Sequence, residues 1–221
     1  MKGRFFVIDG TDGSGKATQT KLLISRMLRV SLPVQTITFP QYGHKSAGLV
    51  EEYLAGKFGT PEEVGSRRAS IFYAVDRYAS SGKISNWLED GNHVIADRYV
   101  ASNMGHQGSK ERRSEERMAF YKWNDELEFG TFKIPRPDLN IILHVPAAVS
   151  MELIEKRGNA KDSHENLAHL TAAETTYLEM ARIFPGFRLI ECVEDGKLLS
   201  PEKVHEKVWE AVQSVLAPVP V

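Results

Sequence analysis

The sequence predicts a three-layer α/β domain in which a five-stranded parallel sheet lies between two layers of helices. Three observations favour this fold class: short apolar, β-branched segments recur along the chain, helical patterns separate them, and a glycine-rich turn joins the first apolar segment to the first helical pattern. Strands that are buried on both faces are apolar along their whole length, and a helix between successive strands makes them parallel.

The expected strands alternate with the expected helices from one end of the chain to the other. The strands are expected at residues 4–8, 34–38, 93–96, 139–145 and 187–192. The helices are expected at residues 16–30, 46–55, 61–88, 111–129, 147–156, 171–183 and 201–216. Ser200 before Pro201 supports the last of these, because serine is a good N-cap and proline presets the first turn. Ligands are then expected beyond the carboxyl ends of the strands.

Length and composition are those of one soluble domain. The chain has 221 residues, 42% of them hydrophobic, and no linker-like tract, so we expect a single domain over residues 1–221. The 28 Lys and Arg residues balance 29 Asp and Glu residues, and the net charge of −1 argues against a nucleic-acid polymer or an anionic membrane as partner. The single Cys192 and the lack of a signal-peptide or membrane-spanning pattern predict a cytoplasmic protein.

The glycine-rich turn has the pattern of a phosphate-binding loop. It reads Gly10-Thr11-Asp12-Gly13-Ser14-Gly15-Lys16. The glycines let backbone N–H groups point inward at phosphate oxygens, the following helix adds its positive end, and Lys16 adds a mobile charge. A nucleoside triphosphate is the implied ligand. Ala17 stands where a magnesium-binding Ser or Thr is usual, so either Thr18 with nearby carboxylates holds magnesium through water, or the nucleotide itself holds it.

A second group of candidate residues surrounds the third strand. Asp97 and Arg98 end that strand, where a carboxylate could place magnesium and a guanidinium could bind an anion through two hydrogen bonds. On the helical pattern before it, Tyr73 and Arg77 are four residues apart and share one face. A base could stack on the ring while Arg77 holds its phosphate. Simple packing of the two side chains on the helix surface is the alternative.

Residues 157–167 form a polar segment without an apolar period. Such a segment can be a solvated loop. In a phosphoryl-transfer enzyme it can instead be a lid that brings basic groups to the phosphates and excludes water. Its position after the fourth strand favours the lid.

In this order the motifs resemble those of the thymidylate kinases, a family of P-loop nucleoside monophosphate kinases. The resemblance covers most of the chain. It rests on the phosphate loop with Asp12, Phe39-Pro40, Tyr73 to Arg77, Asp97-Arg98-Tyr99 with Ser102, Asn103, Gln107 and Gly108 downstream, Pro137-Asp138-Leu139, and Arg157-Gly158 leading to Asp162 and Glu165. It implies a P-loop kinase fold with a lid at about 157–167, and ATP-dependent phosphorylation of dTMP to dTDP for dTTP biosynthesis. It also implies Mg²⁺ and a homodimer, for which residues 61–88 are the candidate surface.

The resemblance also implies the site residues. ATP would be bound by Gly10, Thr11, Asp12, Gly13, Ser14, Gly15, Lys16, Ala17 and Thr18. The acceptor dTMP would be bound by Asp12, Phe39, Tyr42, Tyr73, Arg77, Arg98, Ser102, Asn103, His106 and Gln107. Tyr73 would stack on the base, and Arg77 and Arg98 would bind the acceptor phosphate. Asp12 and Asp97 would order the metal. The catalytic set would be Asp12, Lys16, Arg98 and, from the lid, Arg157, with Lys156 or Lys161 assisting.

Two positions depart from the family pattern. Tyr42 falls where many members carry an Arg, and His106 replaces a more usual aromatic residue. No nucleophile or acid/base dyad is expected, because phosphoryl transfer depends on positioning, water exclusion and cationic clamping.

Three other functions remain open from the sequence. One is a related kinase whose acceptor is dUMP, dGMP or a deoxynucleoside. Another is a P-loop NTPase that switches partners, against which the second set of phosphate groups, Arg77 and Arg98, argues. The third is a nucleotide-binding protein without catalysis, which Ala17 and Tyr42 favour slightly.

Overall fold

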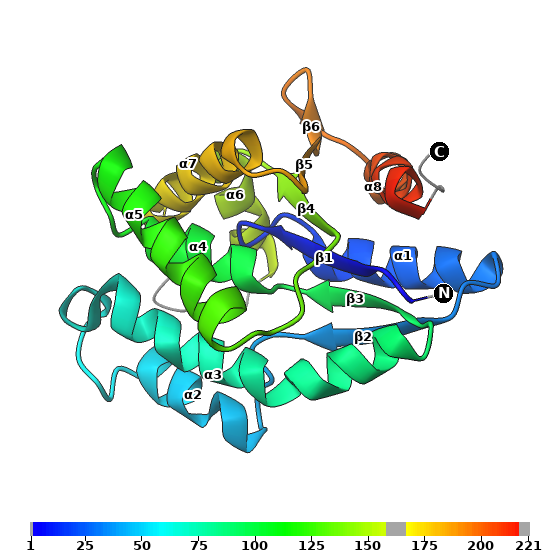
Figure 1. Cartoon of the computed structure of the whole chain (residues 1–221). Coiled ribbons are helices and arrows are strands. Elements are labelled where there is room, and N and C mark those ends of the chain that lie inside the picture. Colours follow the sequence, from blue (N-terminus) through cyan, green and yellow to red (C-terminus); the bar gives the residue numbers. More distant parts are fainter. Residues whose placement is uncertain (1, 158–166, 217–221) are drawn as a thin grey trace.

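A five-stranded, all-parallel sheet forms the centre of the molecule, with helices on both faces (Figure 1). The computed structural model describes residues 2–157 and 167–216. The strands are β1 (Phe5–Gly10), β2 (Val34–Thr38), β3 (His93–Asp97), β4 (Leu139–His144) and β5 (Phe187–Glu191), in the order β2-β3-β1-β4-β5. The expected fold class is therefore confirmed, and each expected strand agrees with the observed one to within two residues.

Eight α-helices lie within the described ranges. They are α1 (Lys16–Arg29), α2 (Gly48–Leu54), α3 (Pro61–Glu89), α4 (Val100–Gly108), α5 (Ser114–Asp125), α6 (Ala147–Arg157), α7 (Leu167–Ile183) and α8 (Pro201–Leu216). Two short helical turns, η1 (Lys45–Ala47) and η2 (Glu126–Thr131), precede α2 and follow α5, and a hairpin of β6 (Val193–Glu194) and β7 (Lys197–Leu198) follows β5. No helix in the described residues is long and apolar enough to cross a membrane.

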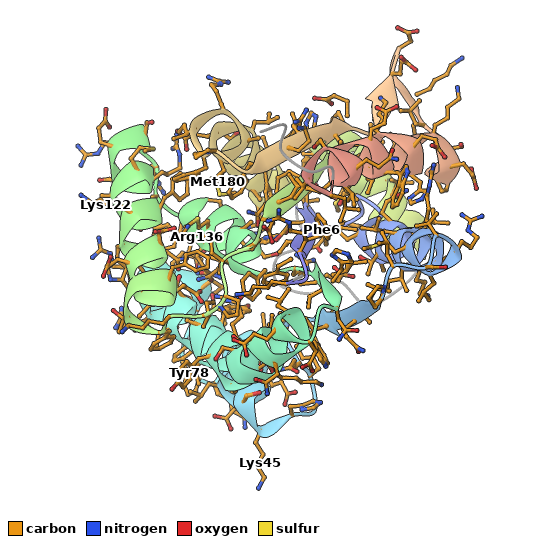
Figure 2. The ribbon with its side chains drawn as sticks, turned by 45° about the vertical axis from the view of Figure 1, so that its right-hand side comes forward. Phe6, Lys45, Tyr78, Lys122, Arg136 and Met180 are labelled. Atoms are coloured by element: carbon orange, nitrogen blue, oxygen red, sulfur yellow. The ribbon has the colours of Figure 1, made fainter. Side chains whose placement is uncertain are left out.

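Alternation along β1 divides the core into two clusters. Phe5 and Val7 face one side of the sheet and pack with buried residues of α3, α4, α5 and α7. Phe6 and Ile8 face the other side and pack with α1 and α8. Figure 2 shows Phe6 in the interior, whereas Lys45 projects from the periphery. Because all six residues of β1 are buried, this strand has a near-continuous apolar sequence, as expected for the central strand of a covered sheet.

Three helix predictions need correction. Residues 46–55 form η1 followed by α2 rather than one helix, and residues 111–129 form α5 and then the π-type turn η2. The helix expected at 61–88 is bent at Gly65, whose φ of 74° interrupts it. It begins where Thr60 and Glu63 form a capping box. Helix α4 was not expected, because it is only nine residues long and contains Gly105 and Gly108, and glycine is a poor helix former. The lid expected at about 157–167 lies almost wholly outside the described residues.

Helix α4 lies against α7 at a position that only glycine can occupy. A Cβ atom on Gly105 would stand 2.6 Å from the ring of Tyr177. The hydroxyl group of Tyr177 in turn donates a hydrogen bond of 2.8 Å to Oδ1 of Asp9, which lies on β1 and is fully buried. Close approach of the two helices therefore connects α7 to the central strand.

We predict that Gly105→Ala destabilises the protein, because overpacking in a core costs about 1–3 kcal/mol. Urea denaturation measures the change. Gly82→Ala in α3 is the matched control, since a Cβ atom there meets no atom within 4 Å. Alanine is the better helix former, so the control should gain up to about 1 kcal/mol. Equal stability changes of the two variants would contradict the close α4–α7 contact.

Candidate active site

The phosphate-binding loop connects β1 to α1 at the carboxyl end of the sheet. Gly10, Gly13 and Gly15 have φ values of 140°, 85° and 89°, which L side chains rarely adopt. A Cβ atom on Gly10 would also stand 2.4 Å from the carbonyl oxygen of Leu143 in β4. The glycine pattern is thus required both by the turn itself and by the close approach of the neighbouring strand.

Lys16, at the start of α1, folds back over the loop. Its Nζ donates hydrogen bonds of 3.0 Å to the carbonyl oxygen of Gly10 and 2.8 Å to that of Thr11. Burial, together with the charge of Arg98, lowers the pKa of Lys16 to about 8. The hydroxyl groups of Thr11 and Ser14 are buried and have no hydrogen-bond partner among the described residues. Ala17 and Thr18 are exposed on the first turn of α1. The loop therefore offers unsatisfied polar groups and a cation to an anion.

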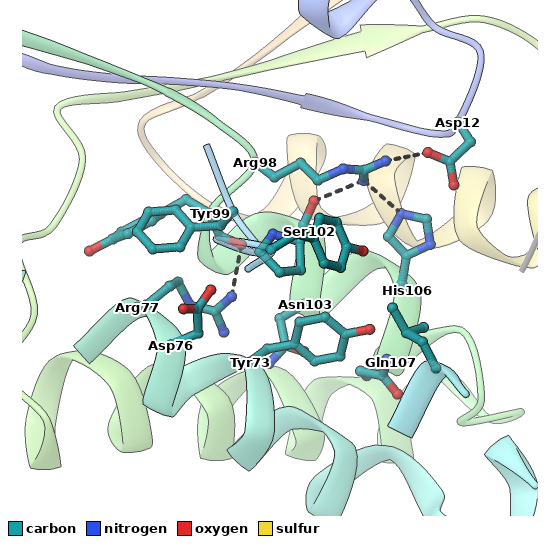
Figure 3. Close-up of a pocket in the computed structure, with 14 residues that line it drawn as sticks. Asp12, Tyr73, Asp76, Arg77, Arg98, Tyr99, Ser102, Asn103, His106 and Gln107 are labelled. Carbon is teal, nitrogen blue, oxygen red and sulfur yellow. Dashed lines mark hydrogen bonds and ion pairs between the residues drawn. The ribbon is translucent and has the colours of Figure 1, made fainter. Parts of the chain in front are cut away.

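An ion pair joins the loop to the end of β3. Nη2 of Arg98 pairs with Oδ1 of Asp12. Nη1 of Arg98 donates a 3.2 Å hydrogen bond to Oγ of Ser102 and lies 3.3 Å from Nε2 of His106 (Figure 3). Although burial favours the neutral acid, Arg98 and Lys16 hold the pKa of Asp12 well below its usual range. Burial also lowers the pKa of His106 well below its usual value. A fixed guanidinium thus stands beside the phosphate loop.

A cavity opens from this ion pair toward α3 and α4. All ten residues predicted to bind the acceptor line it: Asp12, Phe39, Tyr42, Tyr73, Arg77, Arg98, Ser102, Asn103, His106 and Gln107. Four further residues line the cavity without having been predicted to bind the acceptor: Pro40, Leu54, Asp76 and Tyr99. In Figure 3, Asp12 and Arg98 lie on one side of the cavity, and Tyr73, Arg77 and Asn103 lie on the other. The cavity therefore has the Asp12–Arg98 ion pair on the side next to the phosphate loop, and side chains of α3 and α4 on the opposite side.

Arg77 occupies a different environment from Arg98. Its side chain is 2% exposed, and its Nε and Nη2 groups form an ion pair with Glu128 of η2, which is fully buried. Nη1 donates a hydrogen bond of 3.5 Å to the carbonyl oxygen of Tyr99, and the Arg77 side chain lines the cavity (Figure 3). The charge of Arg77 is therefore already compensated. Sequence reasoning missed Glu128, since it lies 51 residues from Arg77 and belongs to no motif.

Asp76, the neighbour of Arg77, organises the entrance to the cavity. Its carboxylate accepts hydrogen bonds from the backbone N–H of Gln41 at 2.8 Å and from the hydroxyl group of Ser46 at 2.6 Å. Because Gln41 precedes Tyr42, these bonds fix the segment that carries Tyr42. The Tyr42 side chain lines the cavity and is 60% exposed. No basic side chain stands at this position.

The carboxylates near the loop fit a hydrated Mg²⁺ ion. Asp97 ends β3, and its side chain makes no hydrogen bond to the described residues. Burial raises its pKa, whereas the nearby Lys16 and Arg98 lower it. Within the described residues there is no group of three His, Cys, Asp or Glu side chains that could hold a metal ion alone. A donor set with few carboxylates suits Mg²⁺ that is shared with nucleotide phosphates. Side chains of Lys156, Arg157 and Lys161 lie outside what the structure describes.

Comparison with known proteins identifies the family. The family model for thymidylate kinase matches residues 8–208. A probable thymidylate kinase from Pyrococcus abyssi is 29% identical over 217 residues, covering 98% of each chain. The thymidylate kinase of Mycobacterium tuberculosis is 30% identical over 181 residues, covering 79% of this chain and 84% of that protein.

A solved structure supports the fold. The thymidylate kinase of Candida albicans superposes with a TM-score of 0.75 at 21% identity, covering 96% of this chain and 92% of the other. The family model spans the phosphate loop, the cavity and both helices that flank the segment expected to be the lid. The chain therefore belongs to the thymidylate kinase family, whose reaction is the ATP-dependent phosphorylation of dTMP to dTDP.

Proposed function

We propose that the loop at Gly10–Lys16 binds ATP and that the adjoining cavity binds dTMP, so that the γ-phosphoryl group passes between them in dTTP biosynthesis. The ion pair of Asp12 with Arg98 carries this proposal, because it places one cation at the boundary between the two sites. Phosphoryl transfer needs two anions held in line in a cationic, water-poor site, and no side-chain nucleophile. The arrangement around Arg98 provides such a boundary.

We assign the acceptor phosphate to Arg98. Its guanidinium is held by Asp12 and Ser102 and lies on the phosphate-loop side of the cavity. The family resemblance implies the same role for Arg77. Because Glu128 compensates the charge of Arg77, we infer that Arg77 contributes a hydrogen bond from Nη1 and little net charge. Because Tyr42 supplies no positive charge, Arg98 would then be the main cation for the acceptor phosphate among the described residues of the cavity.

We infer that the opposite side of the cavity receives the base and the sugar. Tyr73 offers an aromatic face on which a base can stack. Phe39 is 2% exposed and packs against Tyr99, and so forms part of the apolar wall. Asn103, His106 and Gln107 supply polar groups from successive turns of α4.

Magnesium would be held by Asp97 and Asp12 together with nucleotide phosphates. When bound, the Mg²⁺ ion would neutralise phosphate charge. Asp97 is suited to hold it because its carboxylate accepts no hydrogen bond from the described residues of the site. Thr18, one residue after Ala17, remains a candidate through water. For the lid at about 157–167, we keep the proposal that Arg157, with Lys156 or Lys161, completes the cationic clamp.

We also propose that the protein is cytoplasmic, that each chain folds as one domain and that two chains form a homodimer. Helix α3 exposes two large apolar side chains seven residues apart, Ile71 at 41% and Tyr78 at 54%. Residues at this spacing lie on one face of a helix, which supports α3 as the dimer surface. Light scattering should give twice the chain mass, and a monomer mass at micromolar concentration would refute the dimer.

The activity is tested by measuring ADP formation with Mg²⁺ and ATP across dTMP, dUMP, dGMP, dCMP, a deoxynucleoside and no acceptor. We expect a strong rate with dTMP. A preference for another acceptor would keep the mechanism and change the substrate. Hydrolysis that ignores every acceptor would indicate an NTPase, and binding without turnover would indicate a nucleotide-binding protein.

We predict that Arg98→Ala lowers kcat/KM for dTMP by two to four powers of ten, because a cation that meets developing charge lowers the barrier by roughly 3–5 kcal/mol. Steady-state kinetics with a coupled ADP assay measures the loss. Arg112→Ala is the matched control, since Arg112 is exposed and outside the cavity. A near-normal rate in Arg98→Ala would remove Arg98 from the mechanism.

We predict that ATP binding takes up a proton above pH 8 through Lys16. The free pKa of about 8 leaves Lys16 partly neutral at pH 8.5, and bound phosphate raises this pKa because it stabilises the ammonium form. Affinity for ATP should therefore fall as the pH rises through about 8. Calorimetry at pH 8.5 in buffers of different ionisation enthalpy measures the uptake. Lys16→Ala should bind ATP weakly and without proton uptake. Equal proton uptake in the wild-type protein and in Lys16→Ala would contradict the assignment of this proton to Lys16.

A further inference from the structure

A second cavity, which we call the rear cavity, lies against a different face of α4 from the cavity that contains Arg98, the acceptor cavity. From α4, the acceptor cavity is lined by Ser102, Asn103, His106 and Gln107. From the same helix, the rear cavity is lined by three residues that are 4% exposed or less: Val100, Ala101 and Met104. Its other walls come from α5, η2, the start of β4 and the segment between α7 and β5. One helix of nine residues therefore separates the two cavities.

The rear cavity has the size and the lining of a small-molecule site. Its volume is about 570 Å³. Ligand cavities are usually of about 300–1,000 Å³ and are lined mainly by apolar and aromatic side chains. Three rings, those of Phe129, Phe184 and Phe187, line the rear cavity together with Met104 and Met118. Because methionine side chains adapt to the shape of what they contact, this lining suits a flat apolar molecule.

Asn140 is a polar residue in this apolar lining. On β4 it lies between Val7 of β1 and Phe187 of β5, and its neighbours Leu139 and Ile141 pack on the opposite face of the sheet. Asn140 is 8% exposed, and its side-chain amide makes no hydrogen bond to the described residues. Buried polar groups ordinarily have hydrogen-bond partners. Asn140 therefore offers a donor and an acceptor, side by side, to a ligand in the rear cavity.

The charged side chains of the rear cavity balance one another. Arg136 donates hydrogen bonds of 2.8 and 2.9 Å to the two carboxylate oxygens of Asp125, and its guanidinium carbon lies 3.9 Å from the centre of the Phe129 ring. Lys122, labelled with Arg136 in Figure 2, and Glu126 are exposed and add one charge of each sign. Two cations and two anions favour a neutral ligand over a phosphate or another ion.

We propose that the rear cavity binds a neutral aromatic lactam, a flat ring with adjacent N–H and C=O groups, and that this ligand strengthens binding in the acceptor cavity through α4. The ring would occupy the apolar space, its N–H group would donate to Oδ1 of Asn140, and its carbonyl group would accept from Nδ2. A ligand there restricts α4 before the acceptor binds, so that the acceptor then loses less conformational entropy. The coupling, but not the site itself, rests on the proposed binding of dTMP.

The site is tested with 2-quinolone, a bicyclic lactam, and with quinoline, the same ring system without the lactam edge. Each is titrated into the full-length wild-type protein and followed by NMR. We expect 2-quinolone to bind with a Kd of about 1 mM or tighter. Quinoline should bind about tenfold more weakly, because it cannot form both hydrogen bonds with Asn140. No binding of 2-quinolone, or equal affinity for the two ligands, would overturn the proposal, whether a second copy or the protein's own side chains fill the cavity.

A variant then locates the hydrogen bonds. Asn140→Leu should lower the affinity for 2-quinolone about tenfold and leave the affinity for quinoline within about twofold. Arg112→Ala is the control, because Arg112 is exposed and lines neither cavity. Unchanged 2-quinolone affinity in Asn140→Leu would overturn the proposal. The comparison of the two ligands on the wild-type protein does not depend on the stability of any variant.

The acceptor cavity could itself bind the probe, so the titration is repeated at increasing dTMP concentration. A probe in the rear cavity keeps a finite Kd at saturating dTMP and should bind about two- to fivefold more tightly, and dTMP should gain the same factor from the probe. An apparent Kd that rises in proportion to dTMP would place the probe in the acceptor cavity and overturn the proposal. An unchanged Kd would overturn the coupling. If the protein neither binds nor phosphorylates dTMP, the proposed function fails, while the titration without nucleotide still tests the rear cavity.

Discussion

A single buried carboxylate, that of Asp9, fixes the geometry on which the site depends. Asp9 lies on the central strand β1 and is fully buried. Its Oδ1 accepts hydrogen bonds from the backbone of Gly10, the hydroxyl group of Ser102 at 2.7 Å and that of Tyr177 at 2.8 Å. A buried charge is tolerated only when such donors surround it. The strand, the phosphate loop, α4 and α7 are therefore held at one point, and Ser102 in turn holds Arg98.

Much of this arrangement follows from local sequence pattern. The strands β1, β3 and β4 could be predicted because they are buried almost throughout and therefore largely apolar. The edge strands β2 and β5 are only partly buried, and they could be predicted as short segments with apolar or β-branched residues between helical patterns. Similarly, the loop from Gly10 to Lys16 could be recognised because its function depends on backbone conformations that require glycine at fixed spacing. Arg98 could be placed near the phosphate loop because the carboxyl ends of parallel strands meet at the same edge of the sheet. Tyr73 was placed with it only through the family resemblance.

Other features could not be read from the sequence, for physical reasons. Helix α4 is only nine residues long and contains two glycines, so its sequence gives a weak helical signal. Glu128 bonds to Arg77, 51 positions away, and Asn124 accepts a hydrogen bond from Asn103, 21 positions away, and only tertiary packing brings these residues together. A carboxylate or an amide in a helix is ordinarily a surface residue. Their roles become visible only once their exposure is known to be zero.

The two arginines of the cavity each form an ion pair with a carboxylate, but the two pairs differ in burial and therefore in what they can do. The side chains of Arg98 and Asp12 are 22% and 21% exposed, so water and an incoming phosphate can reach the pair. The side chains of Arg77 and Glu128 are 2% and 0% exposed, and breaking such a pair costs about 3–5 kcal/mol. Arg98 can thus exchange or share its partner with a phosphate, whereas Arg77 keeps its carboxylate. A cation that can share its charge suits the reacting phosphate, and one that cannot suits an uncharged base.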